Sequence, residues 1–184
     1  MIILGIDPGT LVTGFGVIER KGSQLRMIEC GAVTNAQKDP MPLRLKFMYS
    51  ALCAAIERTH PDEIALETAF YGKNIQSSLK IGQARGVAML AAAMHGVSLS
   101  EYSPREIKKA VTGNGAATKL QVQFMVTKML RLKSSPGALD VSDALAAAIT
   151  HAYRIASPGA AHTTWEAFIA AHPERVLTKN YIKP

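Results

Sequence analysis

The chain has 184 residues, of which 48% are hydrophobic and 19% are charged; these values fit one globular domain with a full core and leave too little chain for two. The net charge is +7 and the isoelectric point is about 9.5, which favours a polyanionic partner. No apolar run reaches the roughly 18 residues of a membrane-spanning helix, and the N-terminus lacks the basic region of a signal peptide. Because Cys30 and Cys53 also lack metal-ligand spacing, we expect reduced thiols in a cytoplasmic protein without membrane contact.

The first third of the chain predicts four strands and one helix. Strands are predicted over residues 2–7, 14–18, 25–33 and 62–67, and a helix over residues 42–59. The short turn near Gly22 makes the first three strands an antiparallel meander. A strand–helix–strand connection makes the fourth strand parallel to the first. Asp7 and Glu67, which end these two strands, are therefore expected close together at one edge of the sheet.

The rest of the chain predicts alternating helices and one more strand. The predicted elements are a helix over 74–95, a strand over 97–102, and helices beginning at 104, 118 and 140, the last reaching about residue 155. Ser103 with Glu106, and Thr118 with Gln121, have the spacing of capping boxes. The composition changes after residue 157. We expect one domain over residues 1–156 and a peripheral or partly disordered tail over 157–184, with a short helix at 164–171.

Four carboxylates lie at the ends of these predicted core elements. Asp7 and Glu67 end strands, and Asp140 and Asp143 begin an Ala-rich helix, where a spacing of three leaves them about 60° apart on one face. Taken singly, each acid could merely start a turn or cap a helix. Together they would repel one another strongly unless cations were bound. Oxygen ligands of this kind suit Mg²⁺, and two ions about 4 Å apart would clamp a phosphodiester.

Five ordered motifs resemble the RuvC family of bacterial Holliday junction resolvases over roughly residues 1–155. They are Ile6-Asp7-Pro8-Gly9, Glu67-Thr68-Ala69-Phe70, Gly82-Gln83-Ala84-Arg85-Gly86, Ser103-Pro104 and Asp140-Val141-Ser142-Asp143-Ala144-Leu145-Ala146. The resemblance implies an α/β, RNase H-like fold, with a five-stranded mixed sheet flanked by helices. It makes Asp7, Glu67, Asp140 and Asp143 the catalytic ligands of two Mg²⁺ ions per subunit, which Mn²⁺ could replace. The tail beyond residue 156 is not part of the shared pattern.

The same resemblance implies an activity and partners. Members of the family are homodimeric endonucleases of DNA recombination and repair that cut four-way DNA junctions by paired symmetric nicks. In-line hydrolysis leaves a 5′-phosphate and a 3′-hydroxyl, with a preference for a short thymine-containing sequence. The family works with a branch-migration motor, formed by RuvA and RuvB. For this chain, all of these properties are expectations.

Basic and aromatic residues near the acids predict DNA contacts. Residues 101–135 contain seven Lys or Arg and two Glu, a net charge of +5 that suits phosphate binding. Lysines matching Lys108 and Lys119 lie by the scissile phosphate in the family, and Lys119 would stabilise charge developing there. The other predicted contacts are Phe70, Tyr71, Lys73 and Arg105. Two alternatives stay open: Phe70 packs under its own loop, and Lys128, Arg131 and Lys133 form a solvated helix face.

Other features of the chain leave alternatives open. The small residues of 74–95 suit either close approach of a second subunit or burial within the monomer, and the resemblance favours the dimer. His60, His95 and His151 are interpreted as caps or hydrogen-bonded core residues. An actin-like kinase shares the opening strand and turn but needs a second Gly-rich loop and roughly twice the length. A scaffold that binds junctions through vestigial acids is disfavoured by the intact set of four.

Overall fold

The computed structural model describes residues 1–68 and 75–156 of the protein. Phe70, Tyr71, Lys73 and the expected tail, with its helix at 164–171, lie outside the described residues. The described residues form five strands, β1 (Ile2–Asp7), β2 (Val12–Lys21), β3 (Gln24–Thr34), β4 (Glu63–Glu67) and β5 (Ser98–Tyr102). The five helices of this part are α1 (Met41–Thr59), α2 (Ile75–Met94), α3 (Pro104–Thr112), α4 (Lys119–Met129) and α5 (Leu139–Ala156). None of these helices is long and apolar enough to span a membrane.

The five strands form one mixed sheet in the order β3-β2-β1-β4-β5. The hairpins β1–β2 and β2–β3 are antiparallel, whereas β4 is parallel to both β1 and β5. The predicted meander and the predicted parallel pairing are both confirmed. Only β2 differs clearly from its predicted bounds, 14–18. Its ladder continues through the polar residues Glu19, Arg20 and Lys21, where backbone hydrogen bonds persist although the apolar pattern has ended.

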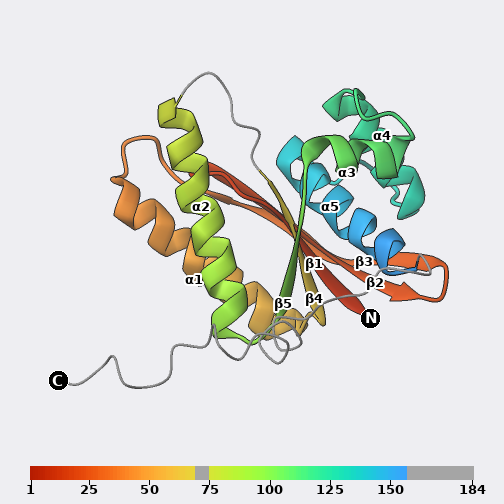
Figure 1. Ribbon diagram of the computed structural model, residues 1–184, viewed down its shortest axis with the longest axis horizontal. Coiled ribbons are helices and arrows are strands. Elements are labelled where there is room, and N and C mark those ends of the chain that lie inside the picture. Colours follow the sequence, from red (N-terminus) through yellow and green to blue (C-terminus); the bar gives the residue numbers. More distant parts are fainter. Residues whose placement is uncertain (69–74, 157–184) are drawn as a thin grey trace, which may run out of the picture.

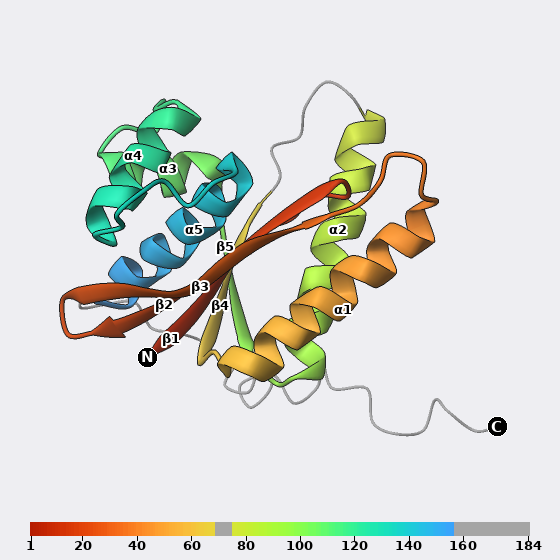
Figure 2. The same cartoon turned by 180° about the vertical axis from the view of Figure 1, so that it is seen from behind.

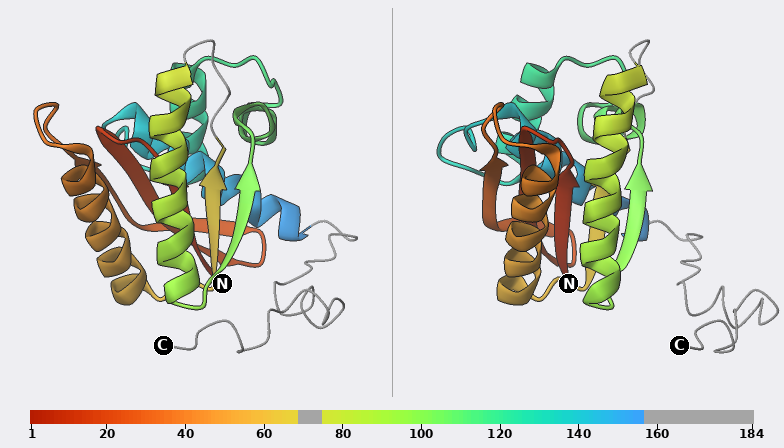
Figure 3. Two further views of the ribbon diagram at one scale, coloured as in Figure 1. Left: turned by 60° about the vertical axis from the view of Figure 1, so that its left-hand side comes forward. Right: turned by 90° about the vertical axis from the view of Figure 1, so that its left-hand side faces the viewer.

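Helices cover the two faces of the sheet in two groups (Figures 1 and 2). Helices α1 and α2 lie side by side on one face (Figure 3), where they bury a core with Leu4, Ile6 and Leu66. Helices α3, α4 and α5 occupy the other face, and their core includes Ile3 and Ala65 of the strands. Successive residues of one strand therefore serve opposite cores, as the two-residue period of a strand requires.

Helix α5 lies unusually close to the sheet because glycines face it. A Cβ atom added at Gly5 would lie 1.9 Å from the backbone oxygen of Ala144, and one at Gly14 would lie 2.0 Å from that of Asp140. Both distances are far below the ordinary contact of 3.4–4 Å. On the helix side, Ala144 and Ala148 are fully buried. Small residues on both elements thus set the height of α5, and with it the position of Asp140 and Asp143.

The predicted helix starts are confirmed at α3 and α4. In both capping boxes the side chain of the cap residue accepts the backbone N–H three residues on, and the side chain at that position accepts the N–H of the cap residue. Helix α5 begins at Leu139, one residue before its predicted start. Asp140 therefore lies inside the first turn of α5, where the helix dipole favours an anion, rather than at its cap.

The three described histidines have structural roles, as predicted. His60 ends α1 in the left-handed region, with φ 44° and its N–H donating to Ile56 O. Nδ1 of His95 lies 2.8 Å from Ala91 O. His151 is fully buried, with Tyr102 Oη 2.6 Å from Nδ1 and Glu63 Oε2 2.6 Å from Nε2. This last group ties α5 to β4 and β5.

Candidate metal centre and nucleic-acid interface

Asp7 and Glu67 lie at adjacent strand ends. The register pairs Ile6 with Leu66, so the two acids follow paired residues of parallel strands and leave the sheet at the same edge. The turn after Asp7 is held closed by buried Thr13, whose hydroxyl donates to Gly9 O at 2.6 Å. Asn35 Nδ2 donates to Thr10 O at 3.1 Å. The backbone just after Asp7 is therefore fixed by hydrogen bonds from β2 and from the residue that follows β3.

The start of α5 brings two more acids to this edge. One carboxylate oxygen from each of Asp7, Asp140 and Asp143 lies within 4.8 Å of the other two. Glu67 is not within that group, but its carboxylate interacts electrostatically with those of Asp7 and Asp143. The structure thus brings together three of the four predicted acids as a tight cluster, with the fourth beside it.

The close packing of these acids changes their ionisation. Burial, together with the negative charge of Asp143, raises the pKa of Asp7 from 3.8 to about 7. Burial and the charge of Asp7 raise the pKa of Glu67 from 4.5 to about 8. The folded chain therefore binds protons here that an unfolded chain would release. Stability contributed by these protons is present at low pH and is lost as the pH rises through about 7–8 when no metal is bound.

Lys119 shows that the cluster accepts a cation. Its Nζ lies 2.5 Å from Asp143 Oδ2 and 3.9 Å from Asp140 Oδ1. Burial alone would lower the pKa of this ammonium, but the hydrogen bond to Asp143 and the neighbouring carboxylate charges raise it. A positive group is thus stabilised at the place where the acids converge. This all-oxygen donor set suits a hard divalent cation such as Mg²⁺ or Mn²⁺.

Two more of the predicted DNA-binding residues lie on α3, near the acids. Lys108 is half-buried, and its charge opposes the rise in the pKa of Glu67. Arg105 is exposed and crosses the loop at Gly115, where an added Cβ would lie 2.8 Å from Arg105 Cγ. Lys128, Arg131 and Lys133 are also exposed, which is compatible with either a phosphate-binding or a simply solvated face.

Sequence reasoning missed the residues that hold the acids in place. Gln123 Nε2 donates to Ser142 Oγ at 3.1 Å and to Gly137 O at 3.0 Å, so α4 is tied to the start of α5. Gly14 sets the position of the Asp140 backbone, and Thr13 and Asn35 hold the turn that follows Asp7. The alternation of Gly14 and Gly16 within a strand was the available signal, because glycine in a strand often marks close approach of another backbone.

Comparison with known proteins agrees with this arrangement. The family model of "Crossover junction endodeoxyribonuclease RuvC" matches residues 3–151. The chain belongs to the RuvC family. A RuvC of Brevibacillus brevis is 48% identical over 152 residues, covering 83% of this chain and 92% of that protein. A RuvC of Salinibacter ruber is 42% identical and covers 96% of this chain and 99% of its own.

Solved structures give the same family and fold. Thermus thermophilus RuvC in complex with a Holliday junction substrate superposes with a TM-score of 0.80 at 33% identity, over 84% of this chain and 94% of that one. The yeast mitochondrial Holliday junction resolvase Ydc2 has a TM-score of 0.58 at 11% identity, over 80% of this chain and 77% of its own, which is a likeness of fold alone. The predicted RNase H-like fold with a five-stranded mixed sheet is thus confirmed.

Proposed function

We propose that this protein is a Holliday junction resolvase, a homodimeric endonuclease that makes paired symmetric nicks in four-way DNA junctions during recombination and repair. The observation that carries the proposal is the cluster of Asp7, Asp140 and Asp143 around the Lys119 ammonium, in a chain of the RuvC family. The related RuvC of Thermus thermophilus was solved with a Holliday junction substrate, which supports the same substrate here.

The proposed chemistry gives separate roles to four acids and one lysine. Asp7, Glu67, Asp140 and Asp143 would hold two Mg²⁺ or Mn²⁺ ions per subunit. When bound, such ions supply electrostatic activation of water and of the phosphodiester. The role of the carboxylates would be to hold these cations beside the attacked phosphate, for in-line hydrolysis that leaves a 5′-phosphate and a 3′-hydroxyl. Lys119 would donate to a phosphate oxygen and stabilise the charge that develops on it.

DNA binding would use residues around this centre. Lys108, whose charge acts on Glu67, and Arg105, three residues before it on α3, would contact backbone phosphates. For Phe70, Tyr71 and Lys73, which lie outside the described residues, the proposal rests on the family resemblance: the aromatic rings would stack on bases unpaired at the junction, and Lys73 would contact a phosphate. A preference for a thymine-containing cleavage sequence belongs to the same proposal.

The homodimer is supported by an unpartnered face of α2. Ile75, Leu79, Leu90 and Met94 are exposed large apolar residues of this helix, and helical spacing puts them along one stripe. Gly82 and Gly86 lie between them, and an added Cβ at either would meet nothing within 4 Å. Glycines in an apolar stripe permit close approach of a second α2. A two-fold dimer would present two equivalent acid clusters to a two-fold junction.

The remaining expectations follow from the family and the composition. We propose that residues 1–156 form the nuclease domain and that 157–184 are a separate tail. The branch-migration motor formed by RuvA and RuvB is the expected partner. Both cysteines are free, which agrees with a reducing cytoplasmic location.

The direct test incubates the protein with a labelled four-way junction or a linear duplex of the same sequence, with Mg²⁺ or EDTA. We expect paired nicks only in the junction and only with Mg²⁺. Absence of junction nicking under these conditions would refute the nuclease. The Asp7→Asn variant should bind junctions without cutting them, and normal cutting by this variant would refute the metal assignment.

The matched control for the charge change is Asp39→Asn. Asp39 lies in the turn before α1 and accepts the Ala36 N–H at 3.2 Å, away from the acid cluster. We expect this variant to cut like the unmodified protein. Binding that weakens steeply with salt, in the absence of metal, would separately support the phosphate contacts of α3.

A further inference from the structure

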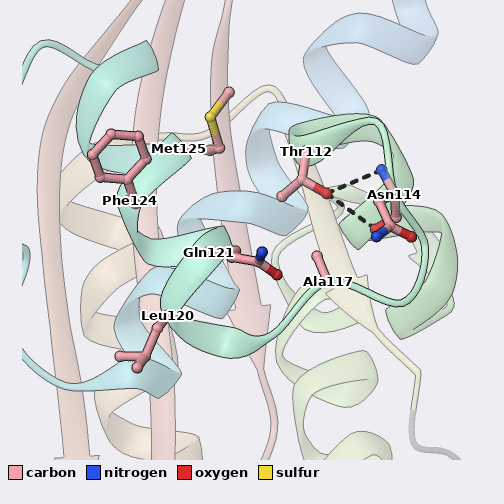
Figure 4. Close-up of a pocket in the computed structure, with 7 residues that line it drawn as sticks. All are labelled: Thr112, Asn114, Ala117, Leu120, Gln121, Phe124 and Met125. Atoms are coloured by element: carbon pink, nitrogen blue, oxygen red, sulfur yellow. Dashed lines mark hydrogen bonds between the residues drawn. The ribbon is translucent and has the colours of Figure 1, made fainter.

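An apolar hollow lies beside the acid cluster, between α4 and the end of α3 (Figure 4). Its volume is about 380 Å³, near the lower end of the roughly 300–1,000 Å³ of small-ligand pockets. It is lined by the apolar residues Ala117, Leu120, Phe124 and Met125 and by the polar residues Thr112, Asn114 and Gln121, and the side chains of Leu120 and Phe124 are largely exposed. The space suits one planar ring with hydrogen-bonding edges, and it is too small for a helix of a partner protein.

The hollow is built before any ligand binds. Thr112 Oγ1 accepts the Asn114 N–H at 3.1 Å, and Asn114 Oδ1 accepts the Ala116 N–H at 2.9 Å, which fixes the loop on one side (Figure 4). On the other side, Gln121 Oε1 accepts the Thr118 N–H at 2.8 Å within the capping box. A ring entering the hollow would therefore require little ordering of the protein.

The position of the hollow puts it within reach of DNA held at the acids. Leu120 directly follows Lys119, whose Nζ contacts Asp143. Phe124 is five residues along α4, or about 7.5 Å along the helix axis. If a strand bound at Lys119 runs along α4, with successive bases about 3.4 Å apart, a nucleotide two or three positions from the cut would lie level with Phe124.

The charges around the hollow favour an anionic chain. Lys128 Nζ lies 5.6 Å from the centroid of the Phe124 ring, at the far end from Lys119. Leu120, Phe124 and Lys128 are spaced four residues apart on α4, so they form one stripe of two apolar side chains and a lysine. Lys119 lies about 140° from Phe124 around the helix and is on another face. Aromatic rings flanked by cations are the means by which proteins bind unpaired nucleotides, with bases on the rings and phosphates on the cations. The phosphate itself would not enter the apolar hollow.

Resting on the proposed resolvase function, we infer that this hollow holds a nucleobase of the substrate, unstacked near the branch point, with its ring on Phe124 and Leu120. Lys128 binds a phosphate of the same strand. The site is a second DNA contact on the opposite sheet face from α2. It selects junctions over duplex DNA, because only a junction offers an unstacked base at low cost.

The test measures binding of a four-way junction in EDTA, so that catalysis does not enter. Phe124→Ala should weaken binding by about 5- to 10-fold, as loss of one stacked base predicts, and Phe124→Tyr should restore it. The matched control is Phe47→Ala. Phe47 is 53% exposed against 60% for Phe124, and it lies on α1 across the sheet. This control should bind like the unmodified protein.

Junctions with a single abasic nucleotide identify the base. At the contacted position, loss of the base should weaken binding by the unmodified protein to the level of Phe124→Ala and should not weaken that variant further. Lys128→Met should reduce the salt slope of binding by about one. Unchanged junction binding by Phe124→Ala overturns the inference. The inference is also overturned if the losses of binding caused by Phe124→Ala and by an abasic nucleotide add at every position tested.

Nicking by the unmodified protein separates this inference from the proposed function. If the protein cuts junctions with Mg²⁺ while Phe124→Ala binds normally, only the base-binding site is refuted. If the unmodified protein binds junctions with the Phe124 dependence described but does not cut them, the base-binding site stands and the resolvase is refuted.

Discussion

The glycine at position 14 of β2 controls the position of a proposed metal ligand on α5. A methyl group added by Gly14→Ala would lie 2.0 Å from the backbone oxygen of Asp140 and 2.9 Å from the N of Val141. Reaching the ordinary contact distance of 3.4 Å requires the start of α5 to move by about 1.4 Å, because neither obstructing atom belongs to a flexible side chain. The carboxylate of Asp140 moves with that backbone.

Two effects of different size follow from this displacement. Overpacking of this kind costs about 1–3 kcal/mol, which corresponds to a fall of about 2–10 °C in the unfolding temperature of a chain this long. The loss of activity should be larger, because misplacing a catalytic group by about 1 Å can reduce the rate about 100-fold. We therefore expect a folded variant with nicking reduced about 100-fold or more.

The assay is single-turnover nicking of a four-way junction at saturating Mg²⁺, at a temperature below the melting transition of each variant. Junction binding in EDTA serves as the test of folding and should change little. The matched control is Gly16→Ala, two residues along the same strand, where the added methyl group meets mainly the flexible Leu145 side chain at 2.5 Å. Leu145 is itself buried, so Gly16→Ala should also cost stability, but the contact lies more than one turn of α5 beyond Asp140 and should displace the Asp140 backbone less, and reduce nicking less, than Gly14→Ala does. Equal activities of Gly14→Ala and the unmodified protein would refute the reasoning.

Three other predictions concern the charges and the proposed dimer. In EDTA, the unfolding temperature should fall as the pH rises from 5 to 8.5, since the pKa values of Asp7 and Glu67 are raised to about 7 and about 8. The Asp7→Asn variant should show a smaller fall. The substitution should also stabilise the metal-free protein at pH 8 by on the order of 1–2 kcal/mol. If thermal melts show a steeper fall of the unfolding temperature with pH in the variant than in the unmodified protein, this prediction is contradicted. Lys119→Met should reduce nicking about 100- to 1,000-fold at saturating Mg²⁺ with junction binding largely retained, and a normal nicking rate would remove its proposed role. Leu79→Glu should give a monomer in light scattering, because a two-fold interface meets the charge twice. The control Leu43→Glu, at another exposed leucine on α1, should not. A dimer that survives Leu79→Glu would place the interface elsewhere.

Local pattern sufficed for most of the elements. The strand that ends at Asp7, the capping boxes of α3 and α4 and the parallel pairing of β1 with β4 all depend on short-range rules, namely alternation, cap hydrogen bonding and the handedness of crossovers. The bounds were least predictable where the chain is polar. The outer part of β2 is held by backbone pairing with both neighbours, which leaves no apolar signature in the side chains.

The candidate site, too, was predictable from the sequence only in part. The sequence by itself determined which residues carry charge at the ends of core elements, and that Asp7 and Glu67 share an edge, because strand direction follows from connectivity. Only the tertiary structure decided how close the third and fourth acids come, since the height of α5 depends on Gly5 and Gly14 of other strands. It also decided that Lys119 lies among the acids, a contact between residues 24 positions apart. Such distances result from packing between elements, and no local pattern encodes them.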